Sequence, residues 1–444
     1  MFGMIYKEAI EYLYNLGESK INLRLENIKY LLERLDNPHK KLRCIHVAGT
    51  NGKGSVCAMI SSILQNDGYS IGLYTSPHLE RFEERIKINN RMISKEDLVR
   101  YLNKIKPVID EMRRDIGEPT FFEAITSMAF LYFADRNVDF AVVEVGMGGR
   151  LDATNVVMPL ISVITNIYID HTKHLGNTIE EIALEKASII KDNGIVVTAV
   201  KDTLPLNIIK SKCLEKNCKL FLVGRDTRFL KLYSDIYGTE FDFYGIYSIY
   251  RSLLVPLVGE HQLINATTAI TVIELLRDYG FRISRDAIRE GLLSVKWPGR
   301  FEIIRRKPFV VIDGAHNPSG MKQLKRTITE LFIYKGLIKR LILIIAISAH
   351  KDMEKMISEI VEIVDTGIIT KLKERRFIEP ERILKEFIKY EKYAVIKESI
   401  PEAIEYAISM GKEDDLICIT GSLYAVAEAR TFLKDDKNDE IKNN

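Results

Sequence analysis

The stretch IHVAGTNGKGSVCAMISSIL, residues 45–64, decides how the chain begins to fold. Its apolar start predicts a buried strand, and the alternately apolar segment from Lys53 onward has helical spacing. The turn between them is rich in glycine, which lets backbone N–H groups converge on an anion at the positive end of the new helix. Lys53 would reach the β- and γ-phosphates of a nucleotide, and the Ser55 hydroxyl is placed for Mg²⁺. The predicted phosphate-loop residues are Gly49, Thr50, Asn51, Gly52, Lys53, Gly54 and Ser55.

The spacing of this loop differs from the GxxxxGK(S/T) pattern of common phosphate loops. Only two residues separate Gly49 from Gly52, and a glycine stands between Lys53 and Ser55. At this point an ordinary glycine turn between a strand and a helix is the alternative to a nucleotide site.

The composition is that of a globular protein with room for about two to four domains. The 444 residues are 46% hydrophobic and 28% charged, and the net charge of only +3 predicts no nucleic-acid surface. Five cysteines without metal-finger spacing indicate thiols in a reducing compartment. The first residues do not resemble a signal peptide, and no apolar run approaches the ~18 residues of a membrane span. We expect a cytoplasmic protein without nucleic-acid or membrane partners.

Strands and helices alternate along most of the chain, which predicts an α/β protein with two domains. The span 195–258 reads as added strands rather than another crossover unit, and Trp297-Pro298-Gly299 indicates a hinge. We expect a phosphate-loop ATPase domain with a mostly parallel sheet over residues 1–296 and a smaller, doubly wound Rossmann-like α/β domain over 297–434. The polar residues 435–444 are expected to form a disordered tail.

Polar residues stand at the ends of several predicted strands in the first domain. Ser76 precedes Pro77 after one strand, Glu144 ends another, and His171 follows a third. Parallel strands present their carboxyl ends at one sheet edge, where doubly wound folds bind ligands, so these side chains should meet near the phosphate loop. Each alone has a simpler interpretation, as a turn residue, a solvated strand end or a surface histidine.

Further candidates lie elsewhere in the chain. Asp313 and His316 belong to DGAHNPSG, at a strand end and near a helix start, and Arg300 just beyond the hinge is placed to reach a phosphate. Asn265 lies near the start of a long helix, and Lys186 lies inside another helix, where a solvated lysine is the default interpretation.

Seven motifs follow one another along the chain: HVAGTNGKGS, TSPHL with RFEERIKIN, EVGMGGRLDATN, DHTKHLG with EKASIIK, GEHQLINA, WPGRFE and DGAHNP. In this order they resemble the folylpolyglutamate synthase and dihydrofolate synthase family of the Mur ligase superfamily. The resemblance covers nearly the whole chain, and the spacing around Lys53 is the family's own. It implies a Mur-ligase-type ATP-binding domain followed by a glutamate ligase domain.

The resemblance implies an ATP-dependent ligase that joins an acid to an amino acid. ATP would phosphorylate the terminal carboxylate of a folate or pteroate substrate. The amino group of L-glutamate would then attack the acyl phosphate and release phosphate as the amide forms. This chemistry needs charge neutralisation and alignment more than a nucleophilic side chain. The resemblance implies that Lys53 is a catalytic residue, which would bind the phosphates together with the backbone of the loop.

The resemblance also implies a magnesium site and a modified lysine. Ser76, Glu144 and His171 match the family's magnesium ligands, beside Ser55 of the loop. Lys186 matches a catalytic lysine that reacts with carbon dioxide to form a carbamate, whose negative charge would help to hold Mg²⁺. Its neutral amine must form first, which burial or nearby cations would favour.

Four matched positions complete the implied active site. Asn265 would contact adenine, Arg300 a phosphate and Asp313 the ribose, while His316 would act near the incoming glutamate as a third catalytic residue. Because these residues come from both domains, domain closure would assemble the site and exclude water.

Some positions depart from the family's usual pattern. Ser188 replaces a common glycine after the carbamylated lysine, and Met147 replaces a leucine; both substitutions look tolerable. In AISAHKDM, Ala346 and His350 stand where the family has a glycine and an aspartate, which puts any nucleotide or glutamate contact there in doubt.

The sequence leaves several functions open. TSPHLERFEERIKIN suits either folate or dihydropteroate as the acceptor, so a dihydrofolate synthase or a bifunctional enzyme is the nearest alternative. A nucleotide-dependent binding or regulatory protein would belong to a different class, and RLDATN disfavours a ligase of cell-wall precursors. We expect a monomer that uses ATP and Mg²⁺.

Overall fold

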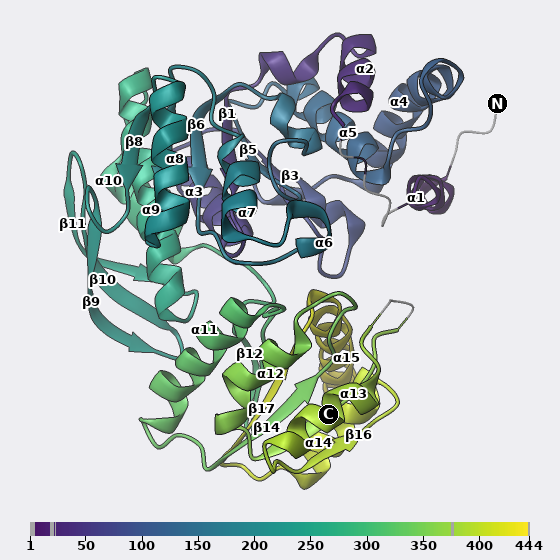
Figure 1. The fold of residues 1–444 in the computed structure, drawn as a ribbon, viewed down its shortest axis with the longest axis vertical. Helices are drawn as coiled ribbons and strands as arrows, with labels where there is room; N and C mark the ends of the chain where they lie inside the picture. Colours follow the sequence, from purple (N-terminus) through teal and green to yellow (C-terminus); the bar gives the residue numbers. More distant parts are fainter. Residues whose placement is uncertain (1–4, 18–21, 23, 374–376, 443–444) are drawn as a thin grey trace.

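The chain folds into two α/β lobes, each built around its own sheet (Figure 1). The computed structural model describes residues 5–17, 22, 24–373 and 377–442, the last eight of these by backbone alone. The larger sheet has the strand order β4-β3-β2-β5-β1-β6-β7-β8 and is parallel from β2 to β8. Its strands are β1 (Cys44–Ala48), β2 (Ile71–Tyr74), β3 (Ile86–Ile88), β4 (Arg91–Met92), β5 (Phe140–Glu144), β6 (Pro159–Ile164), β7 (Ile195–Thr198) and β8 (Lys219–Leu222).

Helices cover both faces of this sheet. One face packs against α3, α9 and α10, and the other against α1, α2, α4, α5, α7 and α8. Helix α3 is buried on all sides from Gly54 to Leu64, so it forms the centre of the lobe. The helices are α1 (Tyr6–Asn15), α2 (Glu26–Arg34), α3 (Lys53–Asn66), α4 (Lys95–Asp115), α5 (Phe121–Asp135), α6 (Thr172–Leu175), α7 (Ile179–Ala187), α8 (Thr203–Glu215), α9 (Glu260–Leu275) and α10 (Arg285–Leu293).

The second lobe is a six-stranded sheet with helices on both faces. Its order is β12-β13-β17-β14-β15-β16, and β12 alone among these strands runs antiparallel to its neighbour. One face packs against α11, α12 and α13, and the other against α14 and α15. The elements are β12 (Glu302–Arg306), β13 (Phe309–Ile312), α11 (Pro318–Ile328), β14 (Arg340–Ile345), α12 (Met353–Ile360), β15 (Thr366–Ile369), α13 (Pro380–Lys389), β16 (Ala394–Ile396), α14 (Ile400–Met410), β17 (Asp415–Thr420) and α15 (Leu423–Lys442).

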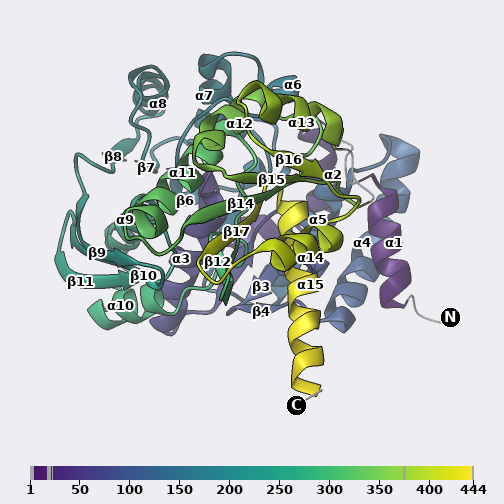
Figure 2. The same cartoon turned by 90° about the horizontal axis from the view of Figure 1, so that it is seen from below.

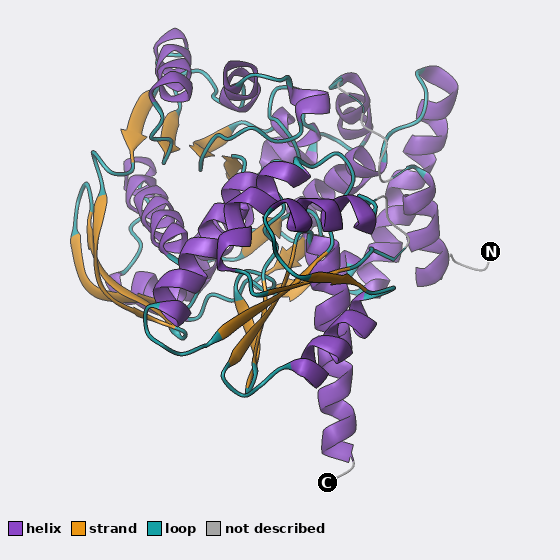
Figure 3. Cartoon of the chain, turned by 60° about the horizontal axis from the view of Figure 1, so that its bottom comes forward, coloured by secondary structure: helices purple, strands orange, loops and turns teal. Residues whose placement is uncertain are grey.

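A small antiparallel sheet lies at the edge of the molecule, where Figure 3 shows it apart from the two larger sheets. It consists of β9 (Arg228–Asp235), β10 (Gly238–Tyr244) and β11 (Ile249–Val255). The prediction of added strands over 195–258 is therefore only partly right. Helix α8 connects β7 to β8 as a crossover, because the apolar residues of LPLNIIKSKCLE recur at helical spacing.

The predicted α/β class with two lobes is confirmed, and residues 294–301 connect the lobes. Over residues 435–442, where the sequence predicts a disordered tail, the structure continues α15 (Figure 2), while 443–444 lie outside the described residues. The charged segment contains no glycine or proline to end the helix. Across the described residues, none of the helices is long and apolar enough to cross a bilayer.

Candidate active site

The phosphate loop lies between β1 and α3, as the sequence predicts. Gly49 and Gly52 have positive φ angles of 148° and 83°. A Cβ at Gly49 would lie 1.9 Å from Thr165 Oγ1, so only glycine fits at this position. Lys53 opens α3, and its Nζ donates to Gly49 O at 3.1 Å and to Thr50 O at 3.2 Å. The ammonium group is therefore held over the backbone of its own loop.

The loop is also tied to the residues after β6. The N–H of Thr50 donates to Asn166 O at 2.9 Å, and the N–H of Asn51 donates to Asn166 Oδ1 at 2.8 Å. Thr165 Oγ1 donates to Asn51 O at 2.7 Å. Because two of the predicted anion-binding N–H groups are engaged in this way, an anion would meet the first turn of α3, whose N–H groups lack partners within the helix.

Ser76 and Glu144 meet at the carboxyl ends of β2 and β5. The Ser76 N–H donates to Glu144 Oε2 at 3.0 Å. Burial raises the pKa of the Glu144 carboxyl, and the positive charge of Lys53 opposes this rise. A buried carboxylate whose charge is incompletely offset favours binding of a further cation.

Lys186 lies behind the loop rather than on a solvated helix face. Only 4% of the residue is exposed, and its Nζ donates to Gly49 O at 2.9 Å. Burial, with the neighbouring Lys53 ammonium, lowers the pKa of the Lys186 amine to about 7. A large fraction of the amine is therefore neutral near neutral pH, which is the form that can react with carbon dioxide.

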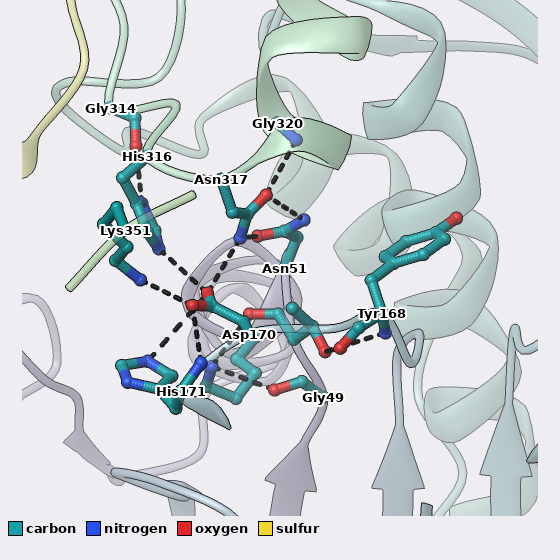
Figure 4. Close-up of polar contacts among 12 residues, drawn as sticks. Gly49, Asn51, Tyr168, Asp170, His171, Gly314, His316, Asn317, Gly320 and Lys351 are labelled. Carbon is teal, nitrogen blue, oxygen red and sulfur yellow. Dashed lines mark hydrogen bonds and ion pairs between the residues drawn. The ribbon is translucent and has the colours of Figure 1, made fainter. Parts of the chain in front are cut away.

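The two lobes meet at Asp170, which Figure 4 shows at the centre of a polar cluster. Lys351 Nζ donates to its Oδ1 at 2.6 Å, and Asn317 Nδ2 donates to Oδ2 at 3.0 Å. His316 Nε2 and His171 Nε2 lie 3.8 Å and 3.9 Å from Oδ2. Although burial opposes ionisation, the positive charge of Lys351 holds the pKa of Asp170 well below its usual range. The cluster therefore contains an ionised, buried carboxylate.

A second contact joins the phosphate loop to the start of α11. The side-chain amides of Asn51 and Asn317 donate to each other's oxygens at 3.2 Å and 2.9 Å. Asn317 Oδ1 also accepts from the N–H of Gly320 at 2.8 Å, which caps α11 (Figure 4). The position of the loop is thus coupled directly to that of the second lobe.

The polar residues after β13 have defined orientations. Asp313 accepts from the N–H of Phe301 at 2.8 Å and from the N–H of Ala315 at 2.9 Å, and burial raises the pKa of its carboxyl. His316 Nδ1 lies 2.9 Å from Gly314 O. Because a carbonyl only accepts, Nδ1 carries the proton and Nε2 keeps a free lone pair. Burial lowers the pKa of His316 to about 3, so the ring is neutral.

Asn265 and Arg300 approach the loop from two other elements. Asn265, on α9, donates through Nδ2 to Gln262 Oε1 at 2.9 Å. A Cβ at Gly52 would lie 2.5 Å from Asn265 Oδ1, so the amide packs directly against the loop. Arg300 Nη1 donates to Gly314 O at 3.3 Å.

A cavity of about 740 Å³ unites most of the predicted residues. It is lined by residues 50–55, Ser76, Glu144, His171, Asn265, Arg300, Asp313 and His316. Gly49 and Lys186 stand behind this lining, joined by their hydrogen bond. In AISAHKDM, Lys351 lines the cavity, whereas Ala346 and His350, the two residues that depart from the family's pattern, do not.

Sequence reasoning missed two parts of this cavity. Asp170, Asn317 and Lys351 form a buried contact between the lobes, yet the sequence analysis predicted none of the three as a site residue. The other part is an apolar section of the wall around Phe121, Phe122, Leu151 and Asp152. The signal in the sequence for this second part was the pair of adjacent aromatic residues, Phe121 and Phe122, at the start of a helix.

The donor set for a metal ion is oxygen-rich. Within the described ranges, no group of three His, Cys, Asp or Glu side chains is arranged to hold a metal. The predicted set contains two such residues, Glu144 and His171, and is completed by the hydroxyls of Ser55 and Ser76 that line the same cavity. Hydroxyl and carboxylate oxygens are ligands that Mg²⁺ accepts, with phosphate oxygens and water completing its shell.

Comparison with known proteins identifies the class. The Mur ligase middle domain matches residues 47–273, and the Mur ligase glutamate ligase domain matches residues 299–423. Dihydrofolate synthase/folylpolyglutamate synthase of Bacillus subtilis is 36% identical over 97% of this chain and 99% of its own length.

Two solved structures share the whole fold. Folylpolyglutamate synthase of Thermotoga maritima has 37% identity and a TM-score of 0.83, covering 97% of this chain and 96% of its own. Folylpolyglutamate synthase of Mycobacterium tuberculosis, complexed with ADP, has 30% identity and a TM-score of 0.90, covering 96% and 98%. The chain therefore belongs to the folylpolyglutamate synthase/dihydrofolate synthase family of Mur ligases.

Proposed function

We propose that the protein is an ATP-dependent ligase that joins L-glutamate to the terminal carboxylate of a folate, as a folylpolyglutamate synthase does. The observation that carries this proposal is a cavity shared by the two lobes, which is lined both by the phosphate loop and by Asp313 and His316. The names of the similar proteins support the same activity.

The first lobe would hold the nucleotide. Lys53 would turn from Gly49 O and Thr50 O toward the β- and γ-phosphates, which also meet the N-terminus of α3. Asn265 would contact the adenine. From the second lobe, Arg300 would reach a phosphate, and the half-buried Asp313 would accept from the ribose hydroxyls.

The residues at the strand ends fit Mg²⁺. Ser55, Ser76 and Glu144 offer oxygen donors at one cavity wall, with His171 beside them. The raised pKa of Glu144 reports a carboxylate that a cation would stabilise. When bound, Mg²⁺ would neutralise phosphate charge and so favour transfer of the phosphoryl group.

Lys186 would act as a carbamate. Its neutral amine would attack carbon dioxide and lose a proton, which turns a buried cation into an anion. The new group would place anionic oxygen donors behind the loop, next to Gly49. A carbamate would also pair with the Lys53 ammonium, which the unmodified lysine repels.

The reaction itself requires alignment within a closed cavity. The acceptor carboxylate would attack the γ-phosphorus of ATP and form an acyl phosphate as the bond to the β-phosphate oxygen breaks and ADP leaves. Lys53 and Arg300 would offset the charge. The amine of glutamate would then attack the acyl carbon, and phosphate would leave. The His316 Nε2 lone pair is available to accept a hydrogen bond from that amine.

The apolar wall suits a flat heterocycle. Phe121, Phe122 and Leu151 provide an aromatic and aliphatic surface, and the buried Asp152 lies among them. A pterin combines an aromatic face with polar edges, so this wall supports a pterin acceptor. It does not separate folate from dihydropteroate, and the B. subtilis relative is named for both activities.

The decisive experiment measures phosphate release from ATP and Mg²⁺ with L-glutamate, comparing tetrahydrofolate, dihydropteroate and no acceptor, with the products identified by mass. Release with tetrahydrofolate and a product heavier by one glutamate residue is expected. Release with dihydropteroate alone would make the protein a dihydrofolate synthase, and release with both would make it bifunctional. ADP binding without release with either acceptor would overturn the ligase proposal in favour of a binding protein.

A further inference from the structure

Trp297, the single tryptophan of the chain, packs against the phosphate-loop helix. A Cβ at Gly54 would lie 2.6 Å from Trp297 Cζ2, closer than a real Cβ approaches another atom, and 3.0 Å from Cε2. Gly54 lies in the first turn of α3 and has no positive φ. It is therefore glycine to make room for the indole and not for backbone freedom, which accounts for the extra glycine between Lys53 and Ser55.

The indole packs between α3 and β3 of the first lobe. It joins the hydrophobic core around α3, and Lys87 Nζ of β3 lies 5.5 Å from the ring centroid. Trp297 is not among the residues that line the cavity. Any effect of the ring on the reaction must therefore pass through other residues.

The residues just after Trp297 are bound to the second lobe. The N–H of Phe301 donates to Asp313 Oδ2 at 2.8 Å, and the N–H of Gly314 donates to Gly299 O at 2.9 Å. Arg300 lies between these two attachment points, three residues beyond Trp297, and lines the cavity. The segment 297–301 is thus fixed to α3 at one end and to the residues that follow β13 at the other.

We propose that Trp297 is a positioning residue: its indole, seated on Gly54, sets Arg300 relative to the phosphate loop, so that Lys53 and Arg300 reach the same nucleotide. The inference rests on the proposed function in one respect, because it takes the ligand of Arg300 to be the nucleotide phosphate. The ring supplies a rigid contact at the place where the chain passes from one lobe to the other.

The first test compares Trp297→Leu with Trp297→Phe, which keeps an aromatic ring. Trp297→Leu should weaken ADP binding, measured by calorimetry, and lower kcat at least tenfold, whereas Trp297→Phe should stay within about threefold. In the Arg300→Ala background, Trp297→Leu should add less than a twofold loss, because its effect acts through Arg300. Lys296→Ala, an exposed neighbour, is the control and should match the wild type. Wild-type behaviour of Trp297→Leu, or losses that multiply with Arg300→Ala, would overturn the proposal.

A second test uses the complementary sizes of the two residues. Gly54→Ala should weaken ADP binding at least tenfold when Trp297 is present and clearly less in Trp297→Leu, where the methyl group has room. Equal losses in both backgrounds would reject the contact as the cause. Circular dichroism and thermal unfolding check that each variant folds. If Trp297→Leu does not fold, Trp297→Phe replaces it as the background in which the loss caused by Gly54→Ala should shrink, because the atoms nearest Gly54 belong to the indole.

These readouts separate the inference from the proposed function. ADP affinities that follow the expected pattern, with no turnover on either acceptor, would uphold the role of Trp297 while the ligase proposal fails. Normal turnover of the wild type, with unchanged ADP affinity in Trp297→Leu, would reject the role of Trp297 alone.

Discussion

The two lobes build their halves of the cavity by different means. The first lobe uses backbone: the loop is held by N–H groups of Thr50 and Asn51 bound to Asn166, next to the start of α3. The second lobe uses side chains that reach across, with Lys351 and Asn317 on Asp170. The first half is therefore held mainly by contacts within its own lobe, whereas the second is aligned only when the lobes are closed. Substitutions in the two halves should consequently fail in different ways.

The largest effect is expected in the half built from backbone. Lys53→Ala should lower kcat about 10³-fold, because it removes the cation nearest the transferred phosphoryl group while the loop itself stays folded. Steady-state phosphate release measures this loss, with thermal unfolding as a check on the fold. Lys41→Ala, which breaks an exposed ion pair with Asp36, should leave turnover unchanged. Similar losses in both variants would mean that the phosphate loop is not the site of transfer.

Lys186→Ala should lower turnover by about 10- to 100-fold while ADP binding largely survives, because the loss is that of a group that would help to hold the metal. A short carboxylic acid such as acetate should restore part of the activity by supplying the missing anion. The same acid should do nothing for Lys53→Ala, which lacks a cation. Unchanged turnover of Lys186→Ala would remove the carbamate from the mechanism.

Substitutions in the Asp170 cluster between the lobes should lower the stability of the protein as well as its turnover. Asp170→Asn or Lys351→Met alone leaves a buried charge without its partner and should cost about 2 to 3 kcal/mol of unfolding free energy. The double variant should cost less than the sum of the two, since neither charge is left. Chemical denaturation of the four proteins measures this coupling.

Another ion pair between the lobes is the matched control. Lys434 contacts Glu80 at 3.0 Å but is 46% exposed, so Lys434→Met should cost no more than about 1 kcal/mol. Equal costs at Lys351 and Lys434 would show that burial of the Asp170 cluster contributes nothing.

The pKa of Lys186 makes stability depend on pH. Between about 7, its value in the folded protein, and 10.5, its ordinary value, the unfolded chain binds a proton that the folded chain does not. Stability should therefore rise with pH across this window, by up to about 1.4 kcal/mol per pH unit. Urea unfolding in buffers free of carbon dioxide should show this slope in the wild type and lose it in Lys186→Met. Parallel pH profiles would mean that the folded protein keeps Lys186 protonated.

The comparison of the two halves also explains which features the sequence could predict. The phosphate loop and the polar strand ends are local patterns, and every parallel strand delivers its carboxyl end to the same sheet edge. The ion pair between Lys351 and Asp170 joins residues 181 positions apart, and no local periodicity indicates such a contact. The sequence analysis did not predict helix α8, because the aromatic and apolar runs around it obscured the helical spacing of its own apolar residues. The burial of Lys186 behind Gly49 depends on how α7 packs against the loop, which only the fold determines.

The smallest effect is expected at Ser188, where the family commonly has glycine. Ser188 ends α7 with φ of −70° and ψ of −4°, a conformation open to any residue, and its hydroxyl donates to Leu184 O at 2.7 Å. Ser188→Gly should therefore keep turnover within about twofold and lower the unfolding free energy by no more than about 1 kcal/mol, since glycine gains freedom in the unfolded chain. Denaturation and phosphate-release assays of this one variant test both statements. A severalfold gain in turnover would instead show that serine hinders the neighbouring Lys186, and would make the first half of the cavity less rigid than its backbone contacts indicate.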